Sequence, residues 1–410
     1  MTKAEVDSSS ASDLVLSLLG LSCCVRKRGV SSHNLLMPPM PKISRDRYYS
    51  IRSLHDALRG EDTILIKGTW LHRQWQRCQP LVRRQELPAE AIWSVDELVD
   101  RADRGDVIYV SVSYCWLTRD HPDPCGKQLG LLGRVVAQFL EHHPLGDLAI
   151  FLDWCSLYQH PRTPAEETSF NRALSNAQLW YVHQVTHVWL LTSLLPGTEM
   201  NNNSNLKGSI GDAACIIDDK PLVAAPVRPF SSRGWTFFEQ ALSRMITPGT
   251  RVLDLGKFDD SCTSWTHTNE VCQAKRKPPV IPEVFITKLR KKRFTENGNR
   301  SLVIEKYALT FFEILGAVEE LSFTNLKWTE KDAARLAELL PRCVHLFGLY
   351  LQGNKLGDEG AAKLMSVLPF CTSLQELHLN GNGLTSEGIA RVTEAWTAAF
   401  KDEARLYLES

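Results

Sequence analysis

One short stretch of the chain places a carboxylate four residues after a large aromatic side chain. If SRGWTFFEQALS is helical, Trp235 and Glu239 share a face, since residues i and i+4 are neighbours on a helix. Arg233 stands just before them. Two interpretations follow. Either Glu239 borders a packed tryptophan and pairs with Arg233 or Arg244, or it points into a pocket and takes part in chemistry.

Further polar and aromatic side chains follow two β-rich apolar runs. Tyr114 and Trp116 end the run VIYVSVSYCWL, which leads to Arg119, and the run LAIFLDWCSLYQ contains Asp153 and Tyr158. Ligands of open parallel sheets bind outside the carboxyl ends of the strands. These residues therefore predict a cleft with aromatic walls and, with the glutamate above, two carboxylates. Taken singly, each has a plainer explanation, because acids at strand ends often cap helices and buried aromatics often belong to a core.

The elements that would position these residues alternate between strand-like and helix-like runs. Runs of four to eight apolar, β-rich residues between amphipathic helical stretches predict βαβ units on a parallel sheet. The strand-like runs are VIYVSVSYCWL, LAIFLDWCSLYQ, THVWLLTSLLPG and TRVLDLGK. We therefore expect an α/β domain over residues 107–272, with an inserted loop at 197–230 and a helical preface at 46–106.

The C-terminal part, residues 301–410, repeats. Leu321, Leu349 and Leu377 begin similar segments 28 residues apart, and each segment precedes an amphipathic helical stretch. The pattern LxLxxNxL at this period predicts leucine-rich repeats of the ribonuclease-inhibitor-like class, a short α/β solenoid. Strand residues between the leucines line the concave face of such arrays and suit a protein or peptide partner. A short array that only packs against its neighbouring domain is the alternative. The predicted partner-binding residues are Tyr350, Gln352, His378 and Asn380.

Composition limits the classes of function. Lys and Arg together number 47, as do Asp and Glu, which argues against a dominant nucleic-acid or polybasic membrane role. Eleven cysteines without a CxxC pair indicate a reducing compartment, and no apolar run is long enough to span a bilayer. We therefore predict a cytoplasmic protein.

Two basic stretches leave alternatives open. Cys23 and Cys24 lie beside Arg26, Lys27 and Arg28 in a disordered leader predicted over 1–45, which suggests palmitoylation and membrane tethering. A short amphipathic helix or an unstructured tail explains the same residues. Residues 273–300 carry AKRKPP and KLRKKRF, which resemble a bipartite nuclear-import signal. A solvated basic linker is the plainer interpretation.

Three blocks of the predicted α/β domain resemble the heterokaryon-incompatibility (HET) domain. SVSYCW, FLDWCSLYQ and RGWTFFEQAL occur in the order of that family's three motifs, and the resemblance covers roughly residues 107–255. The sequence departs from the family pattern at Leu117, Cys155 and Phe238. The matching positions are Tyr114, Trp116, Asp153, Gln159, Arg233, Trp235, Thr236 and Glu239.

HET domains are similar to Toll/interleukin-receptor (TIR) domains, so the resemblance implies a flavodoxin-like fold. In enzymatic TIR members, a glutamate at the Trp-to-Glu spacing of WTFFE serves NAD cleavage. The resemblance thus implies NAD as substrate, no metal, a catalytic Glu239 and an Asp153 that shapes the cleft. Expulsion of a neutral nicotinamide needs no general acid, and one carboxylate can stabilise an oxocarbenium-like transition state. The implied NAD-binding residues are Tyr114, Trp116, Arg119, Tyr158, Arg233 and Trp235.

Two other functions compete with NAD hydrolysis. Many domains of this shape only self-associate, and resemblance of fold does not carry function. The first alternative is therefore a non-catalytic interaction scaffold. The second is a sensor for signalling or self/non-self recognition, in which the repeats bind a ligand and control assembly of the TIR-like domain.

Overall fold

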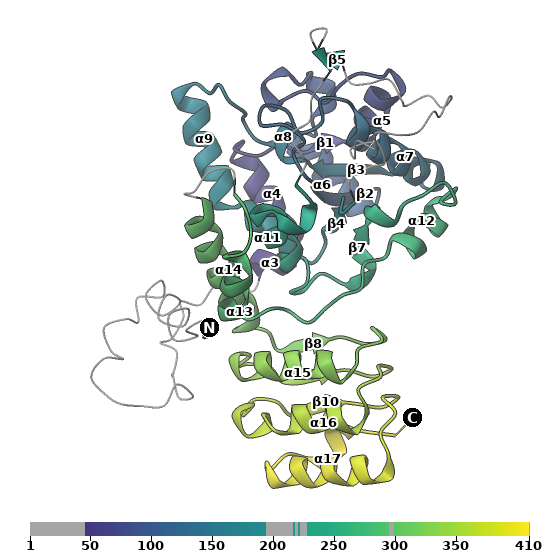
Figure 1. Cartoon of the computed structure of the whole chain (residues 1–410), viewed down its shortest axis with the longest axis vertical. Coiled ribbons are helices and arrows are strands. Elements are labelled where there is room, and N and C mark those ends of the chain that lie inside the picture. Colours follow the sequence, from purple (N-terminus) through teal and green to yellow (C-terminus); the bar gives the residue numbers. More distant parts are fainter. Residues whose placement is uncertain (1–45, 194–215, 218–219, 222–227, 295–298, 410) are drawn as a thin grey trace, which may run out of the picture. The chain divides into compact units, whose positions relative to one another are not determined.

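The computed structural model describes residues 46–193, 216–217, 220–221, 228–294 and 299–409. The chain divides into two compact units, each considered by itself (Figure 1). One unit, here the sheet unit, comprises residues 48–243 and 247–274; the other, the repeat unit, includes 244–246 and the chain from 275 onward. The predicted leader with Cys23 and Cys24, and most of the predicted insertion 197–230, lie outside the described residues.

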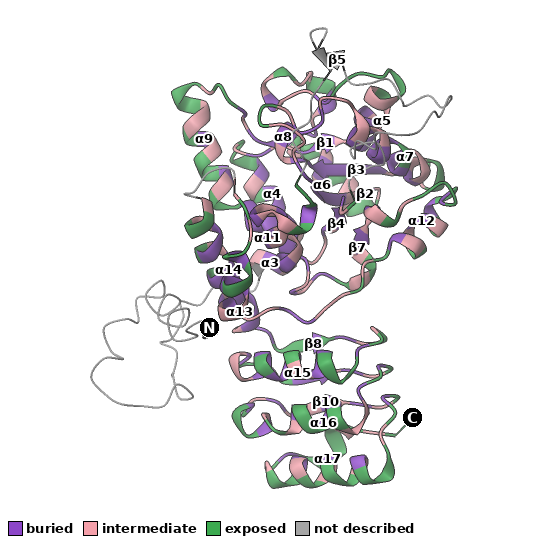
Figure 2. Ribbon diagram, viewed as in Figure 1, coloured by how far each residue is buried: buried purple, intermediate pink, exposed green. Residues whose placement is uncertain are grey.

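The sheet unit contains a mixed five-stranded sheet in the order β1-β3-β2-β4-β7. Strands β3, β2, β4 and β7 are parallel, and β1 pairs antiparallel with β3 at one edge. Almost every residue of the central strands is buried (Figure 2), which is why they read as continuous apolar runs. The strands are β1 (Ile66–Lys67), β2 (Val107–Ser113), β3 (Asp147–Phe151), β4 (His187–Leu190) and β7 (Val252–Asp254).

Helices surround this sheet. Their bounds within or at the start of the unit are α3 (Asp46–Tyr49), α4 (Ile51–Arg59), α5 (Gly68–Gln76), α6 (Val95–Arg104), α7 (Lys127–His142), α8 (Asp153–Ser156), α9 (Pro164–Ser175), α10 (Ala177–Val182), α11 (Gly234–Leu242) and α12 (Trp265–Cys272). A separate two-residue pair, β5 (Ile216–Ile217) and β6 (Lys220–Pro221), is what the structure describes of the predicted insertion up to residue 227.

Alternation along β2 directs its side chains to two different sets of helices. Val110 and Val112 join the apolar core with residues of α5 and α7. The intervening residues face the other way: Ser111 Oγ donates to the Trp180 carbonyl of α10 (2.7 Å), and Ser113 points to α11. Because strand side chains alternate with a period of two, the last residue of β2 must face α11 if Ser111 faces α10.

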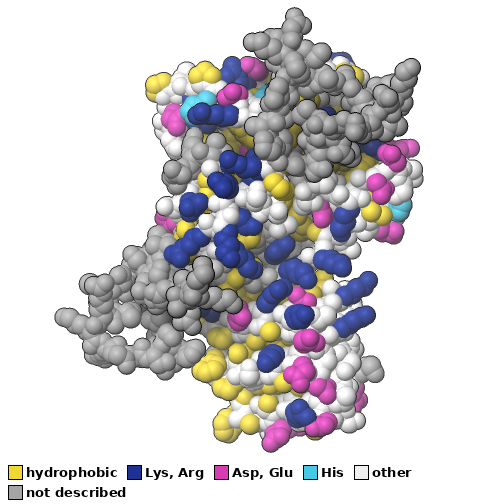
Figure 3. Space-filling model, in the orientation of Figure 1, with side chains coloured by type: hydrophobic (Ala, Val, Ile, Leu, Met, Phe, Trp, Pro, Cys, Tyr) yellow, Lys and Arg dark blue, Asp and Glu magenta, His cyan; other side chains and the backbone are white. Residues whose placement is uncertain are grey.

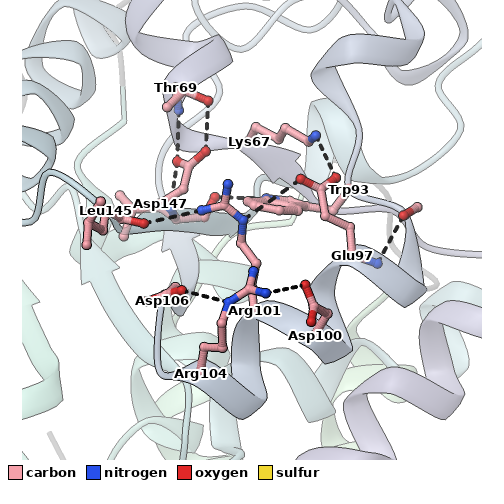
Figure 4. Close-up of polar contacts among 12 residues, drawn as sticks. Lys67, Thr69, Trp93, Glu97, Asp100, Arg101, Arg104, Asp106, Leu145 and Asp147 are labelled. Carbon is pink, nitrogen blue, oxygen red and sulfur yellow. Dashed lines mark hydrogen bonds and ion pairs between the residues drawn. The ribbon is translucent and has the colours of Figure 1, made fainter.

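The predicted helical preface also supplies a strand, β1, which its two-residue length hides from pattern analysis. A polar network fastens this segment to β3 (Figure 4). Asp147 accepts hydrogen bonds from the backbone N–H (2.9 Å) and hydroxyl (2.8 Å) of Thr69 at the start of α5. Lys67 of β1 pairs with Glu97 of α6 at 2.8 Å. The carboxylate of Asp147 therefore satisfies donors at a helix N-terminus that has no cap of its own.

The repeat unit contains a second, all-parallel sheet in the order β11-β10-β9-β8. Leu321 pairs with Leu349 and Leu349 with Leu377, so the register follows the 28-residue period. A helix follows each of the first three strands. The bounds are β8 (Glu320–Ser322), α15 (Glu330–Leu339), β9 (Gly348–Tyr350), α16 (Gly357–Met365), β10 (Glu376–His378), α17 (Ser386–Ala398) and β11 (Leu406–Tyr407).

Buried asparagines hold successive repeats together. Asn354 Oδ1 accepts from the backbone N–H groups of Leu326 and Trp328, and its Nδ2 donates to the carbonyls of Phe323 and Leu351. Asn382, 28 residues later, donates to two carbonyls in the same manner. The invariant place of Asn in LxLxxNxL thus has a physical cause here, because the amide satisfies backbone groups that turn away from the sheet.

The segment predicted as a basic linker contains a helix, α13 (Pro282–Leu289), and is followed by α14 (Asn299–Leu315). Phe285 of α13 stacks on Tyr307 of α14 with ring centroids 3.7 Å apart, and both are buried. Apolar residues at 285, 286 and 289 give α13 a buried face that the basic residues around it obscure in the sequence.

Candidate functional site

The carboxyl end of the central strand brings together Ser113 and Glu239. Ser113 Oγ donates to Glu239 Oε2 at 2.5 Å. Glu239 lies in the middle of α11 and is half-buried. Burial raises the pKa of Glu239 to about 8; the hydrogen bond from Ser113 opposes that rise and the negative charge of Asp153 adds to it. Glu239 is thus a carboxyl group held largely protonated at neutral pH, while retaining contact with solvent.

Asp153, the second predicted catalytic residue, follows β3 and begins α8. Tyr114 donates a short hydrogen bond to Oδ1, and Trp116 Nε1 donates to Oδ2 at 3.1 Å. The backbone N–H of Trp154 also donates to Oδ1 at 2.7 Å. Burial raises the pKa of Asp153 in spite of these three donors. Since both carboxyl oxygens are engaged, the arrangement supports a positioning function for Asp153 more than contact with a substrate.

The structure therefore brings four of the predicted residues together: Tyr114, Trp116, Asp153 and Glu239. It adds Tyr181 of α10, which the sequence analysis did not single out. The Tyr181 hydroxyl donates to the Val112 carbonyl (3.2 Å) and also hydrogen-bonds to Glu239. Tyr181 sits in an apolar helical run, and only the packing of α10 beside α11 reveals its place. No signal in the sequence distinguishes it from a core tyrosine.

Two of the predicted NAD-binding residues surround α11 without contacting either carboxylate in any described hydrogen bond. Trp235 packs edge-on against Phe238 with ring centroids 5.9 Å apart. Arg233 Nε donates to the Arg228 carbonyl (3.1 Å), while its positive charge lowers the otherwise raised pKa of Cys115. Trp235 thus shares its helix face with Glu239, as predicted, and packs as part of the support of α11.

The other two predicted residues have different surroundings. Arg119 is exposed in the loop after β2. Tyr158 stacks against the buried guanidinium of Arg84, with the Arg84 Cζ atom 3.8 Å from the ring centroid. Arg84 donates to the carbonyls of Glu61 and Asp62, both at 2.5 Å. Tyr158 is therefore part of a structural contact with the preface, which makes it a poor candidate for stacking on a ligand.

Gln159, a position shared with the HET motif, has an architectural function. Its Nε2 donates to the carbonyls of Asp153 (3.0 Å) and Leu157 (2.8 Å), and its side chain is buried. These bonds close the turn after α8. The glutamine thereby fixes the backbone of Asp153 and, through it, the carboxylate that meets Tyr114 and Trp116.

The repeats carry a second candidate site on their strands. His378 lies between Tyr350 and Tyr407 of the adjacent strands, with ring centroids 4.8 Å and 4.0 Å away. Glu376 Oε1 lies 2.9 Å from His378 Nε2, and this contact lowers the pKa of Glu376. Gln352 and Asn380 follow on the same strands; within the described chain, the oxygen of each amide has no hydrogen-bond partner. All four predicted residues thus lie along one row of strands.

Histidines and acids do not cluster further. Among the described residues, no group of three His, Cys, Asp or Glu side chains is arranged to hold a metal ion. His183 and His187, which share the spacing of a zinc helix, are separated by the end of α10. Burial lowers the pKa of each to about 4. In the same described part of the chain, no helix has the length and apolar character required to cross a bilayer.

Comparison with known proteins identifies the repeats. Residues 343–365 and 370–391 match the family model of the leucine-rich repeat. Comparison with curated proteins finds none that matches the chain. The C-terminal part therefore contains leucine-rich repeats, as predicted, and repeats of this kind suggest protein–protein interaction. The match to the family model lies within the repeat unit.

Proposed function

We propose that this chain is a partner-binding protein whose leucine-rich repeats hold a protein or peptide along the row Tyr350, Gln352, His378 and Asn380. The observation that carries this proposal is the aromatic row across three adjacent strands, from Tyr350 through His378 to Tyr407. Side chains with few rotatable bonds supply contact area at a small loss of conformational entropy. Polar amides beside them provide orientation.

A peptide library displayed against the purified full chain tests this proposal. Peptides selected on the wild type should lose at least tenfold in affinity on Tyr350→Ala/His378→Ala. The matched control, Lys355→Ala/Lys363→Ala, changes two exposed residues outside the row and should bind as the wild type does. Selected peptides that bind equally well to the aromatic double variant would show that the row is not the binding site.

The second candidate function is NAD cleavage by a HET- or TIR-like domain. Numbered in chain order, the parallel strands β3, β2, β4 and β7 lie in the order 2-1-3-4, the beginning of the flavodoxin-like order, and this supports the proposed family. Glu239 lies beside the carboxyl end of β2, next to β4, where that order reverses. Ligands of doubly wound sheets bind at this position.

In this proposal, the bond between the ribose C1′ and the nicotinamide nitrogen breaks, and its electron pair leaves with the neutral nicotinamide. Water then attacks C1′ and releases a proton. The positive charge of the bound substrate would favour ionisation of Glu239, whose carboxylate then stabilises the oxocarbenium-like state. Ser113 and Tyr181 would orient that carboxylate. Asp153 would hold Tyr114 and Trp116 in place.

NAD consumption by the purified full chain, concentrated on a surface to cluster it, tests the second candidate. Wild-type turnover that Glu239→Gln abolishes would support a hydrolase. Turnover unchanged in Glu239→Gln would remove Glu239 from the chemistry. The absence of turnover in folded, clustered wild type would favour the non-catalytic scaffold, which the mutual contacts of Tyr114, Trp116 and Asp153 also support.

A further inference from the structure

Positive charge gathers in the repeat unit, in a chain whose net charge is zero. Residues 275–293 contain eight Lys or Arg and one acid, Glu283. Figure 3 shows Lys and Arg side chains collected over the region of α13, α14 and α15. Three cations come from three separate segments of this unit: Arg244 directly after α11, Lys288 from the last turn of α13, and Arg335 from α15.

Contacts between backbone and side chains tie these segments to one another. Arg276 Nη2 donates to the carbonyl of Met245 at 3.1 Å, which fastens residues 244–246 to the chain that precedes α13. Arg342, just after α15, pairs with Glu283 in the first turn of α13 at 3.1 Å. The positions of the three cations are therefore set by the fold of the unit rather than by flexible side chains alone.

The cluster lacks counter-charges. In the portion of the chain that the structure describes, neither Arg244 nor Lys288 makes a hydrogen bond or an ion pair. Burial lowers the pKa of Lys288, and the charges of Arg335 and Arg244 lower it further. Arg335 has Asp332 as a partner, at 3.6 Å, but the same carboxylate oxygen lies 3.7 Å from Lys277. Desolvated cations that repel one another destabilise a fold unless an anion joins them.

We propose that Arg244, Lys288 and Arg335 form a binding site for a small polyphosphate anion. The two guanidinium groups offer planar, bidentate donors that match phosphate oxygens, and the ammonium group adds a compact charge. An anion of several charges suits the site because three cations approach from different segments. A single carboxylate could not meet all three. Free polyphosphates and phosphorylated lipid headgroups share this chemistry.

Titration calorimetry with inorganic tripolyphosphate tests the site on the full chain. The variant Lys288→Gln/Arg335→Gln should bind at least tenfold more weakly than the wild type. The matched control Lys355→Gln/Lys363→Gln removes the same charge from exposed lysines and should remain within twofold. Tripolyphosphate should also raise the melting temperature of the wild type. Without anion, Lys288→Gln alone should melt no lower than the wild type, since the substitution relieves repulsion.

Several results would overturn the proposal. Equal losses in the cluster variant and the control variant would show diffuse attraction instead of a site. A lower melting temperature of Lys288→Gln without anion would assign that lysine a structural function. RNA binding that depends on Lys288 and Arg335, without tripolyphosphate binding, would favour nucleic acid instead. Vesicles with and without phosphatidylinositol bisphosphate separate the two sources: retention on the former, displaced by tripolyphosphate, assigns the headgroup, and no retention assigns the free anion.

Discussion

Replacing Glu239 by Gln should change how stability depends on pH. The folded protein holds the pKa of this carboxyl at about 8, against 4.5 for an unperturbed glutamate. Below pH 4.5 the group is protonated in both the folded and the unfolded state. As the pH rises from 4.5 to 8, the unfolded state ionises while the folded state stays protonated. The wild type therefore loses stability over this window, and Gln at position 239 does not.

The size of the effect follows from the pKa difference. A shift of one unit corresponds to about 1.4 kcal/mol, so a difference of this size gives at most about 5 kcal/mol. Solvent contact of the half-buried carboxylate screens part of it, which lowers the expected value to about 2–4 kcal/mol. Glu239→Gln should thus match the wild type near pH 4.5 and exceed its unfolding free energy by that amount at pH 9.

Urea unfolding of the full chain at pH 4.5, 7 and 9, followed by tryptophan fluorescence, measures this difference. Subtraction of the wild-type curve from the variant curve cancels the titration of every other group. Glu141→Gln, an exposed glutamate on α7, serves as the control and should show no pH-dependent difference. A difference between Glu239→Gln and wild type that is the same at pH 4.5 and pH 9 would refute the reasoning.

Three further substitutions test the packing. Gly133→Ala should lower the free energy of unfolding by about 1–3 kcal/mol, because its Cβ would lie 2.3 Å from the Trp75 ring; Gly130→Ala, which meets open space, should be neutral or stabilising in the same urea titration. Asn354→Ala should lower the repeat unit's unfolding free energy by about 3 kcal/mol, measured by thermal unfolding, since four backbone groups lose their partner. Arg84→Met should cost about 2–4 kcal/mol in urea, because two carbonyls lose a charged donor.

The candidate site was predictable in part. The positions of Asp153 and Tyr114 at the ends of adjacent parallel strands follow from the apolar runs and from the rule that such ends share one edge. The partners did not follow. Tyr181 reaches Glu239 only because α10 packs beside α11, and Arg84 reaches Tyr158 from a segment more than seventy residues away in the chain. Such contacts depend on the packing of elements whose order in the sequence does not reveal their spacing.

The sequence by itself determined the repeats and the alternation of strands and helices in the sheet unit. A period of 28 residues is local information, because each Leu and Asn position has the same function in every repeat. The tertiary structure alone decided the ionisation of Glu239 and the gathering of Arg244, Lys288 and Arg335. Both depend on burial and on charges from distant segments, and the distances that set electrostatic energies exist only once those segments have packed.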